Sequence, residues 1–187
     1  MVNQSKPTVA IFGGSFDPPH KGHQRIVEKA IELLNIDKLI VVPAFLNPFK
    51  TSSLADAQQR LEWSHLLFDD IPNVIVDDYE IKEGKSTTTE QSVKHFNMTY
   101  NVKYLIIGSD NLSTLTKWHQ FEWLNSHITW VIVTRRGHLL ETARLESYKT
   151  ITLDANISST DIRESEDLQH VDKKIKKSVK DILEGNK

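Results

Sequence analysis

Short apolar runs alternate with longer amphipathic segments along this chain. The runs occupy residues 8–12, 38–42, 73–76, 103–107 and 128–133, and each is rich in valine, isoleucine or leucine. Continuous apolar runs of this length are typical of strands buried on both faces, as in a parallel sheet. The pattern therefore predicts five buried strands.

The segments between these runs have helical periodicity. Residues 22–34, 55–68 and 89–98 are the candidate helices. The apolar face of the first consists of Ile26, Ala30, Ile31 and Leu34, and that of the second of Leu61, Leu66, Leu67 and Phe68. Alternation of strand and helix predicts an α/β fold, with a Rossmann-like doubly wound parallel sheet and right-handed crossovers.

The C-terminal segment, residues 166–187, is rich in lysine and amphipathic. One face carries Val171, Ile175, Val179, Ile182 and Leu183. This spacing predicts a C-terminal amphipathic helix that packs on a core formed by residues 8–165. A length of 187 residues suits a single domain.

Composition narrows the class of protein. With 23 basic and 25 acidic residues the formal net charge is −2, which does not favour a nucleic-acid partner. The absence of cysteine excludes disulfides and thiol nucleophiles. No apolar stretch suits a signal peptide or a membrane span, so we expect a cytoplasmic protein without a membrane partner. The sequence does not indicate an oligomeric state.

In open α/β sheets, ligands bind beyond the carboxyl ends of the strands, which selects residues 13–23, 43–50, 108–118 and 135–136. In the first of these loops, Gly13 and Gly14 let the backbone approach a ligand. His20 and His23 are spaced to lie on one side of a helix start, where free N–H groups favour phosphate. Two histidines at this spacing are also common as solvated surface residues, and no third ligand suggests a metal site. We expect Asp17 to brace the loop through hydrogen bonds.

A second candidate anion site lies at residues 157–164. Ser158 followed by Asp161 resembles a capping box, so a helix should begin there. Arg163 lies one turn later, where it joins the hydroxyls and free N–H groups of the helix start. An ordinary capped helix with a surface arginine would have the same pattern.

Together these segments resemble a known family. Residues 14–23 match every defined position in the Gly-x-Phe-Asp-x-x-His-x-Gly-His signature of the nucleotidyltransferase α/β phosphodiesterase superfamily, and residues 157–163 are similar to its second motif. The resemblance implies direct in-line attack by a substrate phosphate on the α-phosphorus of ATP. The catalytic residues would be His20, His23 and Arg163. Mg²⁺ would be bound mainly through the ATP phosphates, with no metal site of the protein's own.

The likeness to bacterial nicotinate-nucleotide adenylyltransferases extends over residues 9–164. Four segments support this likeness. They are Pro18-Pro19 before His20, residues 47–50 with Lys50, residues 80–89, and residues 107–112 followed by Trp118. The resemblance implies that ATP and nicotinate mononucleotide are the partners, and that deamido-NAD and pyrophosphate are formed in NAD biosynthesis.

The site residues carried over by this likeness form two sets. The ATP set consists of Gly13, Gly14, Ser15, Phe16, His20, His23, Gly108, Asp110, Ile157, Ser159, Thr160 and Arg163. The acceptor set consists of Ser15, Lys50, Thr87, Thr88, Trp118 and Arg135. In the second set, Trp118 would supply an aromatic face for the pyridine ring, and Thr87 and Thr88 would offer N–H groups to its carboxylate.

Several of these residues have a structural alternative. Asp110, expected to accept hydrogen bonds from a ribose, is also a suitable helix cap. Trp118 suits simple packing, and Arg135 with Arg136 suits a solvated pair. Phe49 stands where the family has a histidine, and Thr87 stands where it has a tyrosine.

The sequence leaves three alternative functions open. They are a nicotinamide mononucleotide adenylyltransferase, a phosphopantetheine adenylyltransferase, and a nucleotide-binding regulator without turnover.

Overall fold

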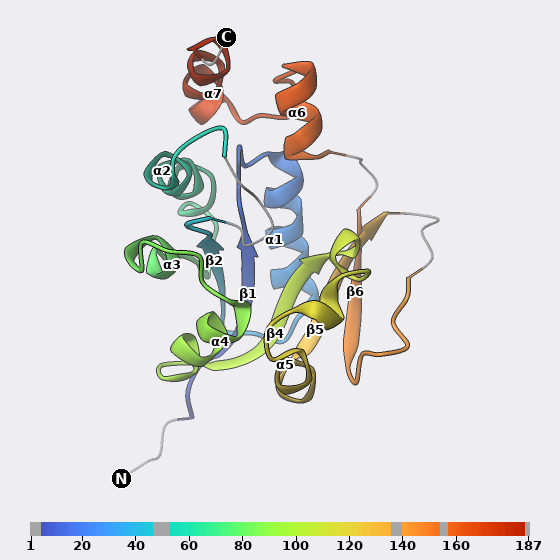
Figure 1. Ribbon diagram of the computed structural model, residues 1–187. Helices are drawn as coiled ribbons and strands as arrows, with labels where there is room; N and C mark the ends of the chain where they lie inside the picture. Colours follow the sequence, from blue (N-terminus) through green and yellow to red (C-terminus); the bar gives the residue numbers. More distant parts are fainter. Residues whose placement is uncertain (1–4, 47–52, 136–139, 154–156, 186–187) are drawn as a thin grey trace.

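A six-stranded parallel sheet organises the part of the chain that the structure describes. The computed structural model describes residues 5–46, 53–135, 140–153 and 157–185 (Figure 1). The sheet has the order β3-β2-β1-β4-β5-β6. Its strands are β1 (Thr8–Gly14), β2 (Lys38–Pro43), β3 (Val74–Val76), β4 (Asn101–Gly108), β5 (Thr129–Arg135) and β6 (Tyr148–Leu153). All five neighbouring pairs are parallel. The predicted Rossmann-like α/β fold is therefore confirmed.

The five apolar runs coincide with the first five strands, but β6 was not predicted. In β6 the residues Tyr148, Lys149 and Thr150 are exposed, and Ile151 is the fully buried one. The strand lies at the edge of the sheet and pairs with β5. An edge strand needs little apolar surface, so its sequence lacks the continuous run that marks the central strands.

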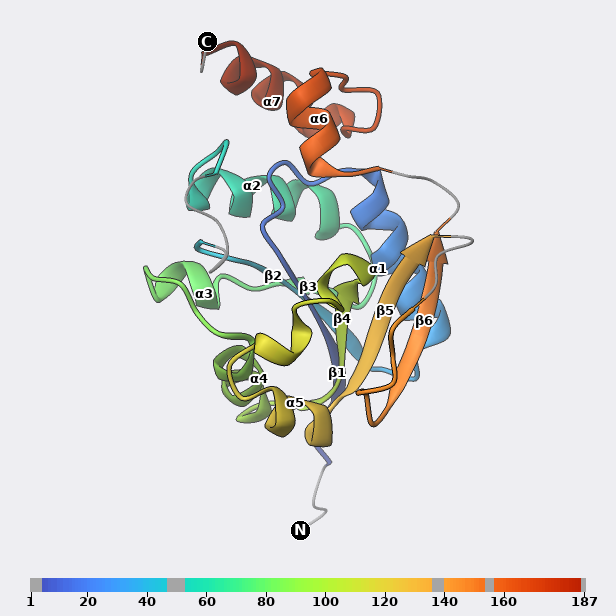
Figure 2. The same ribbon diagram turned by 45° about the vertical axis from the view of Figure 1, so that its right-hand side comes forward.

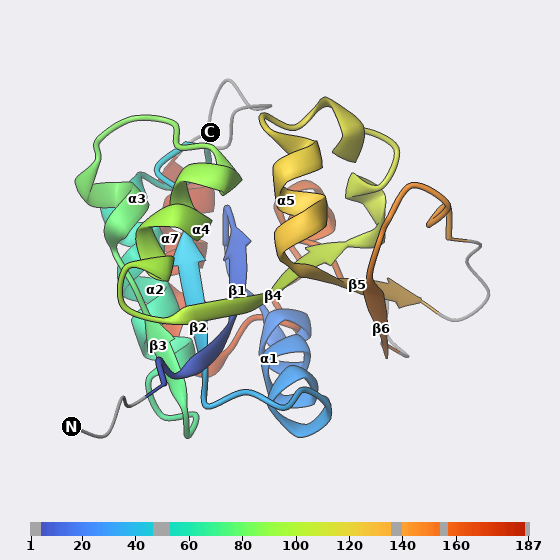
Figure 3. The ribbon, with the colours of Figure 1, turned by 90° about the horizontal axis from the view of Figure 1, so that it is seen from below.

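Helices cover both faces of the sheet (Figure 3). On one face, Ala10 and Phe12 of β1 pack in a cluster with residues of α1 (Lys21–Leu33), α2 (Ala57–Phe68), α6 (Ser159–Ser165) and α7 (Lys173–Gly185). On the other face, Val9 and Ile11 pack with α4 (Thr89–Asn97), α5 (Phe121–His127) and the short helix η2 (Leu115–Lys117). Successive side chains of β1 thus enter opposite layers.

The predicted helix faces are correct except at one position. Leu61, Leu67 and Phe68 are buried, whereas Leu66 is 48% exposed. The buried side of α2 also contains Arg60, Trp63 and Ser64, so its core-facing stripe is partly polar and leaves Leu66 outside. Two short helices, α3 (Tyr79–Lys82) and α5, were not predicted. Segments of four and seven residues are too short to establish a helical period.

The C-terminal helix packs on α2 and lies with α6 at the end of the molecule opposite the N-terminus (Figure 2). Ile175 and Val179 are buried beneath it. Trp63 Nε1 of α2 donates a hydrogen bond to Ser178 Oγ at 3.1 Å. The predicted amphipathic helix is confirmed, although it begins at Lys173, after a loop.

The sheet order creates a natural ligand position. From β1 the chain crosses to β2 on one side, and it later returns to β4 on the other side of β1. Because the crossovers diverge there, a crevice forms beyond the carboxyl ends of β1 and β4. These ends are Gly14 and Gly108.

Candidate active site

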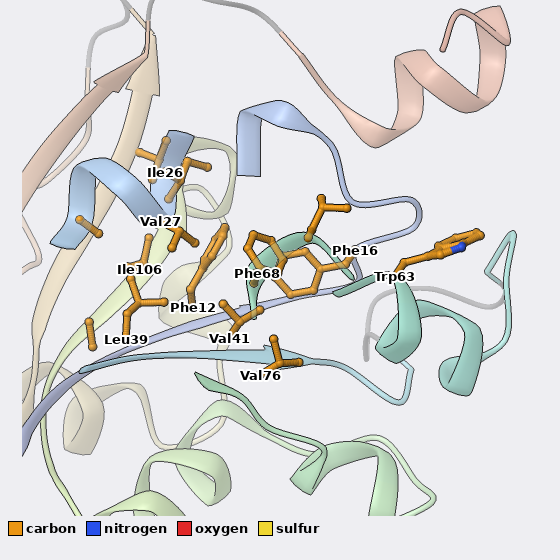
Figure 4. Packing of buried hydrophobic residues seen from close by; sticks show 14 of the residues in the cluster. Phe12, Phe16, Ile26, Val27, Leu39, Val41, Trp63, Phe68, Val76 and Ile106 are labelled. Carbon is orange, nitrogen blue, oxygen red and sulfur yellow. The ribbon is translucent and has the colours of Figure 1, made fainter. Parts of the chain in front are cut away.

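The loop after β1 is shaped by its packing on the core. Phe16 has a positive φ of 46° and is buried against Phe12 and Phe68 (Figure 4). A Cβ atom on Gly14 would lie 3.1 Å from the Phe16 ring, so glycine gives this ring its space. The Phe16 side chain thus belongs to the core, and a ligand at this loop would meet its backbone.

The two histidines form a stacked pair at the start of α1. The ring centroids of His20 and His23 are 3.8 Å apart, with an angle of 28° between the planes. The backbone N–H of His20 donates a hydrogen bond to His23 Nδ1 at 3.1 Å. Since Nδ1 accepts this bond, the proton of a neutral His23 lies on Nε2. His20 Nδ1 is buried and has no hydrogen-bond partner among the described residues.

Both imidazoles are neutral near pH 7. Burial lowers the pKa of His20 to about 4, helped by the neighbouring His170, while Asp161 acts in the opposite direction. Burial, and then the charge of His20, holds the pKa of His23 well below its usual value. In the ligand-free protein the pair therefore consists of neutral imidazoles rather than cations.

Gly22 lets the His20 ring lie against the start of the helix. A Cβ atom on Gly22 would be 2.9 Å from both Cε1 and Nδ1 of His20, which is closer than van der Waals contact allows. The same Cβ would lie 3.5 Å from the Cβ of Ile157. The predicted ATP residue Ile157 is thus beside the histidine pair, although it comes from the far end of the chain.

Asp17 braces the loop as expected. Its carboxylate is buried and accepts hydrogen bonds from the backbone N–H groups of Leu54 (2.8 Å) and Ala55 (3.0 Å). The segment before α2 is thereby tied to the loop after β1. Each carboxylate oxygen thus has a structural hydrogen-bond partner.

The second motif lies directly on the first loop. Ser158 caps α6 by accepting a hydrogen bond from the N–H of Asp161, as the capping pattern predicted. Ser159 Oγ donates to the carbonyl oxygen of Pro18 at 2.9 Å. Arg163 donates from Nη1 to the carbonyl oxygen of Asp17 at 2.5 Å and from Nη2 to Thr160 Oγ1 at 3.1 Å. Folding thus joins the two motifs into one site.

Arg60 is a structural residue of the site that the sequence did not reveal. Its guanidinium group is buried and donates hydrogen bonds to the carbonyl oxygens of Ser15 (2.6 Å), Ala44 (2.7 Å) and Phe45 (2.7 Å). It therefore joins the loops that follow β1 and β2. Burial lowers the pKa of Arg60, opposed by the nearby Asp17. An isolated arginine in a helical pattern gives no sign of such a role.

A cleft of about 480 Å³ opens beside this loop, between β1 and β4. It brings together seven of the predicted site residues, which are Gly13, Gly14, Thr87, Thr88, Gly108, Asp110 and Trp118. Asp110 lies in the short helix η1 (Ser109–Asn111), and its carboxylate folds back over Gly108, where any Cβ atom would collide with it.

The threonines and the tryptophan form facing parts of the cleft wall. Thr88 caps α4, and its N–H donates to Gln91 Oε1 at 3.0 Å. This engages the amide that we expected Thr88 to offer a ligand, and leaves the N–H of Thr87 without a partner among the described residues. Trp118 packs edge-on against Trp130, and its buried Nε1 has no partner in the same part of the chain. Trp118 thus has a packing role as well as a place in the cleft.

The cleft also contains a carboxyl group that the sequence did not single out. Glu80 of α3 lines the cleft, and Ser92 Oγ donates to its Oε1 at 2.7 Å. Burial raises the pKa of Glu80 to about 7, although the Ser92 hydrogen bond acts in the opposite direction. A periodic pattern does not distinguish such a residue from a solvated glutamate.

The structure does not describe the side chains of two predicted site residues. Lys50, with Phe49, lies outside the described residues. Arg135 is the last residue of β5, at the same edge of the sheet as the cleft, but its side chain is not described.

Within the described ranges, no group of three or more histidine, cysteine, aspartate or glutamate residues is arranged to hold a metal ion. None of the helices described is long and apolar enough to cross a membrane.

Comparison with known proteins shows which family the chain belongs to. The cytidylyltransferase-like family model matches residues 11–165. A "Probable nicotinate-nucleotide adenylyltransferase" of Sulfurovum sp. is 67% identical over 187 residues, with all of both chains covered. One of the same name from Nitratiruptor sp. is 45% identical, covering 83% of this chain and 86% of its own. The solved Plasmodium falciparum nicotinic acid mononucleotide adenylyltransferase complexed with NaAD has the same fold, with a TM-score of 0.74 at 20% identity, covering 96% of this chain and 95% of its own.

Proposed function

Because the chain belongs to the cytidylyltransferase-like family and, within it, to the nicotinate-nucleotide adenylyltransferases, we propose that it transfers the adenylyl group of ATP to nicotinate mononucleotide. The products are deamido-NAD and pyrophosphate. The observation that supports this most is the meeting of two motifs from opposite ends of the chain, where Ser159 and Arg163 bond to the loop that positions His20.

The reaction is a direct displacement. A phosphate oxygen of nicotinate mononucleotide attacks the α-phosphorus of ATP, and the bond from that phosphorus to the bridging oxygen of pyrophosphate breaks. Both reactants are already phosphates, so no covalent intermediate with the protein is needed. Catalysis then consists of positioning and stabilisation of charge on the transferring group.

The neutral histidine pair suits this stabilisation. His23 is held by the N–H of His20 with its proton on Nε2, so it can donate a hydrogen bond without tautomer exchange. Neutral donors that are already oriented need no reorganisation when charge develops. Arg163, whose side chain is 24% exposed, supplies the fixed positive charge beside them.

The remaining ATP contacts follow from position. Gly13, Gly14, Ser15 and Phe16 offer backbone to the nucleotide at the end of β1, while Ser159 and Thr160 bind the β- and γ-phosphates with Ile157 beside them. Gly108 and Asp110 hold the ribose. Mg²⁺ would be held mainly by the ATP phosphates and would neutralise part of their charge. Asp17 of the same loop is bound by two backbone amides and braces the loop.

The acceptor occupies the cleft. Trp118 and the amide of Thr87 line its pyridine end, with Thr88 holding the start of α4. Ser15, Lys50 and Arg135 contact the acceptor phosphate. Thr87 stands in for the family's tyrosine, so recognition of the ring relies on the backbone and on Trp118.

The test is an acceptor comparison. Purified protein, ATP and Mg²⁺ are offered nicotinate mononucleotide, nicotinamide mononucleotide or phosphopantetheine, and pyrophosphate release is recorded. We expect the highest kcat/KM with nicotinate mononucleotide. A preference for either other acceptor would replace the proposed reaction, and a protein that binds ATP without releasing pyrophosphate with any acceptor would be a nucleotide-binding regulator.

A further inference from the structure

The acceptor cleft contains a carboxyl group that is held through one of its oxygens. Glu80 Oε1 accepts the hydrogen bond from Ser92, which is itself buried. Among the described residues, Ser92 is the only hydrogen-bonding or ion-pairing partner of this carboxyl group. Glu80 and Ser92 line the cleft with Thr87 and Thr88, at the end assigned above to the pyridine ring.

The lysines of the two helices that carry Glu80 and Ser92 are paired with other carboxylates. On α3 itself, Lys82 pairs with Asp78 at 3.0 Å, and on α4 Lys94 pairs with Glu90. Within the described part of the chain, Glu80 is therefore a partly buried carboxyl group without a cation, which is why burial raises its pKa to about 7. Near neutral pH the protonated form is well populated, and it carries an O–H donor.

The titratable groups around Glu80 come from several elements and from the residues that follow them. Those that share the cleft are Asp110 of η1, and Lys117 and His119 on either side of Trp118. On α3 the neighbours are Tyr79, whose pKa burial raises with help from Glu83 and Glu80, and Glu83 itself. On α4 they are His95, stacked on Tyr79, and Glu90, bound by Lys94 and His119.

Resting on the proposed function, we propose that Glu80 is a specificity-determining residue, whose protonated carboxyl group donates a hydrogen bond to the ring carboxylate of nicotinate mononucleotide. A carboxylate accepts such a bond and repels the ionised form of Glu80. A carboxamide is neutral, and its NH₂ group donates to an ionised Glu80. The two acceptors therefore favour opposite protonation states of the same residue.

Proton uptake follows from this arrangement. Where Glu80 is ionised in the free protein, binding of nicotinate mononucleotide takes one proton from solvent onto the carboxyl group. The preference for nicotinate over nicotinamide mononucleotide then falls above about pH 7, by up to about tenfold per pH unit. Both acceptors carry the same phosphate group, so the ratio isolates the ring substituent.

The experiment measures kcat/KM for both acceptors between about pH 6.5 and 9, a range that brackets the shifted pKa. Wild type is compared with Glu80→Gln, which keeps an oxygen for Ser92 and a neutral donor. Glu83→Gln, at the exposed C-cap that directly follows the same helix, is the matched control. We expect the preference to fall with pH in wild type and in Glu83→Gln, and to be flat in Glu80→Gln. In Ser92→Ala the fall should begin at higher pH, because the lost hydrogen bond favoured the ionised form.

The same pH-dependent preference in Glu80→Gln as in wild type would overturn the proposal. If that variant does not fold, as judged by its thermal unfolding, an unshifted profile in Ser92→Ala overturns it instead. Failure of the proposed function is a separate result, since it appears as absent turnover in wild type. Calorimetric binding of nicotinate mononucleotide in buffers of different ionisation enthalpy then decides proton uptake without any turnover.

Discussion

At the scale of single residues, the site depends on groups whose properties are set by burial. His20 and His23 would be half-charged near pH 6.5 in water, but inside the protein they are neutral donors. Their orientation depends on a backbone N–H and on a glycine that has no side chain to push the ring away. The position of the His20 ring is therefore sensitive to one added methyl group at Gly22.

We expect Gly22→Ala to lower kcat by about 10²–10³-fold, as loss of an oriented transition-state donor does. The new Cβ atom displaces the His20 ring, so the loss should approach that of His20→Ala. Stability should be kept, since alanine is favoured over glycine in a helix by up to about 1 kcal/mol. Pyrophosphate release and thermal unfolding are the measurements.

Gly185→Ala is the control for this substitution, because nothing lies within 4 Å of its added Cβ atom. It should have wild-type kcat. A Gly22→Ala protein with near-normal turnover would show that the position of the His20 ring does not matter for catalysis.

At the scale of elements, the C-terminal segment is part of the support for the active-site loop. The carbonyl oxygen of His170, just before α7, accepts a hydrogen bond from the N–H of Lys21 at the start of α1 (2.9 Å). Upstream, α6 bonds to the loop through Ser159 and Arg163. The apolar face of α7 packs on α2 and so supports the segment that carries His170.

We expect Ile175→Ala to lower the free energy of unfolding by about 2–5 kcal/mol, since it leaves a cavity under α7. Activity should be lost at lower urea concentration than in wild type, because α1 loses its support at Lys21. The urea midpoint and the urea dependence of turnover are the measurements. Lys177→Ala, on the exposed face with 89% side-chain exposure, should change the midpoint little. Equal effects of the two substitutions would mean that α7 is not docked in solution.

At the scale of the whole molecule, two kinds of buried titratable group influence stability in opposite directions. The pKa of His20 is about 4 in the folded protein and 6.5 for an unperturbed imidazole, so the unfolded chain takes up the proton first as pH falls and stability decreases. The pKa of His23 is shifted in the same direction. Glu80 has a raised pKa of about 7, so the folded state keeps its proton longer and stability increases as pH falls from 7 to about 4.5.

As pH falls from 7 to 5, the loss of stability caused by the two histidines exceeds the gain caused by Glu80. We therefore expect a lower urea midpoint at pH 5 than at pH 7. A net difference of one proton corresponds to at most about 1.4 kcal/mol per pH unit. In the double variant His20→Asn/His23→Asn only Glu80 remains of the three, and the order of the two midpoints should reverse. A midpoint of the double variant that keeps the wild-type pH dependence would contradict neutral, buried histidines.

The central strands, the main helices and two candidate phosphate-binding motifs can be recognised from the amino-acid sequence. A strand buried on both faces needs a continuous apolar run, and an amphipathic helix needs apolar residues at its own period. Both patterns are local and can therefore be recognised in the sequence. The capping role of Ser158 follows from the same local chemistry. Asp17, by contrast, is bound by the backbone N–H groups of Leu54 and Ala55, which lie far from it in the sequence.

How residues far apart in the sequence come together depends on the fold. It placed Arg163 on the carbonyl of Asp17, buried Arg60 among three carbonyl groups, left Leu66 exposed, and added the edge strand β6. It also set the charge of His20 and Glu80, because desolvation depends on the surroundings of a group and these come from other parts of the chain. The composition of the sequence and the spacing of its residues do not reveal these surroundings, because they arise only when distant segments pack together.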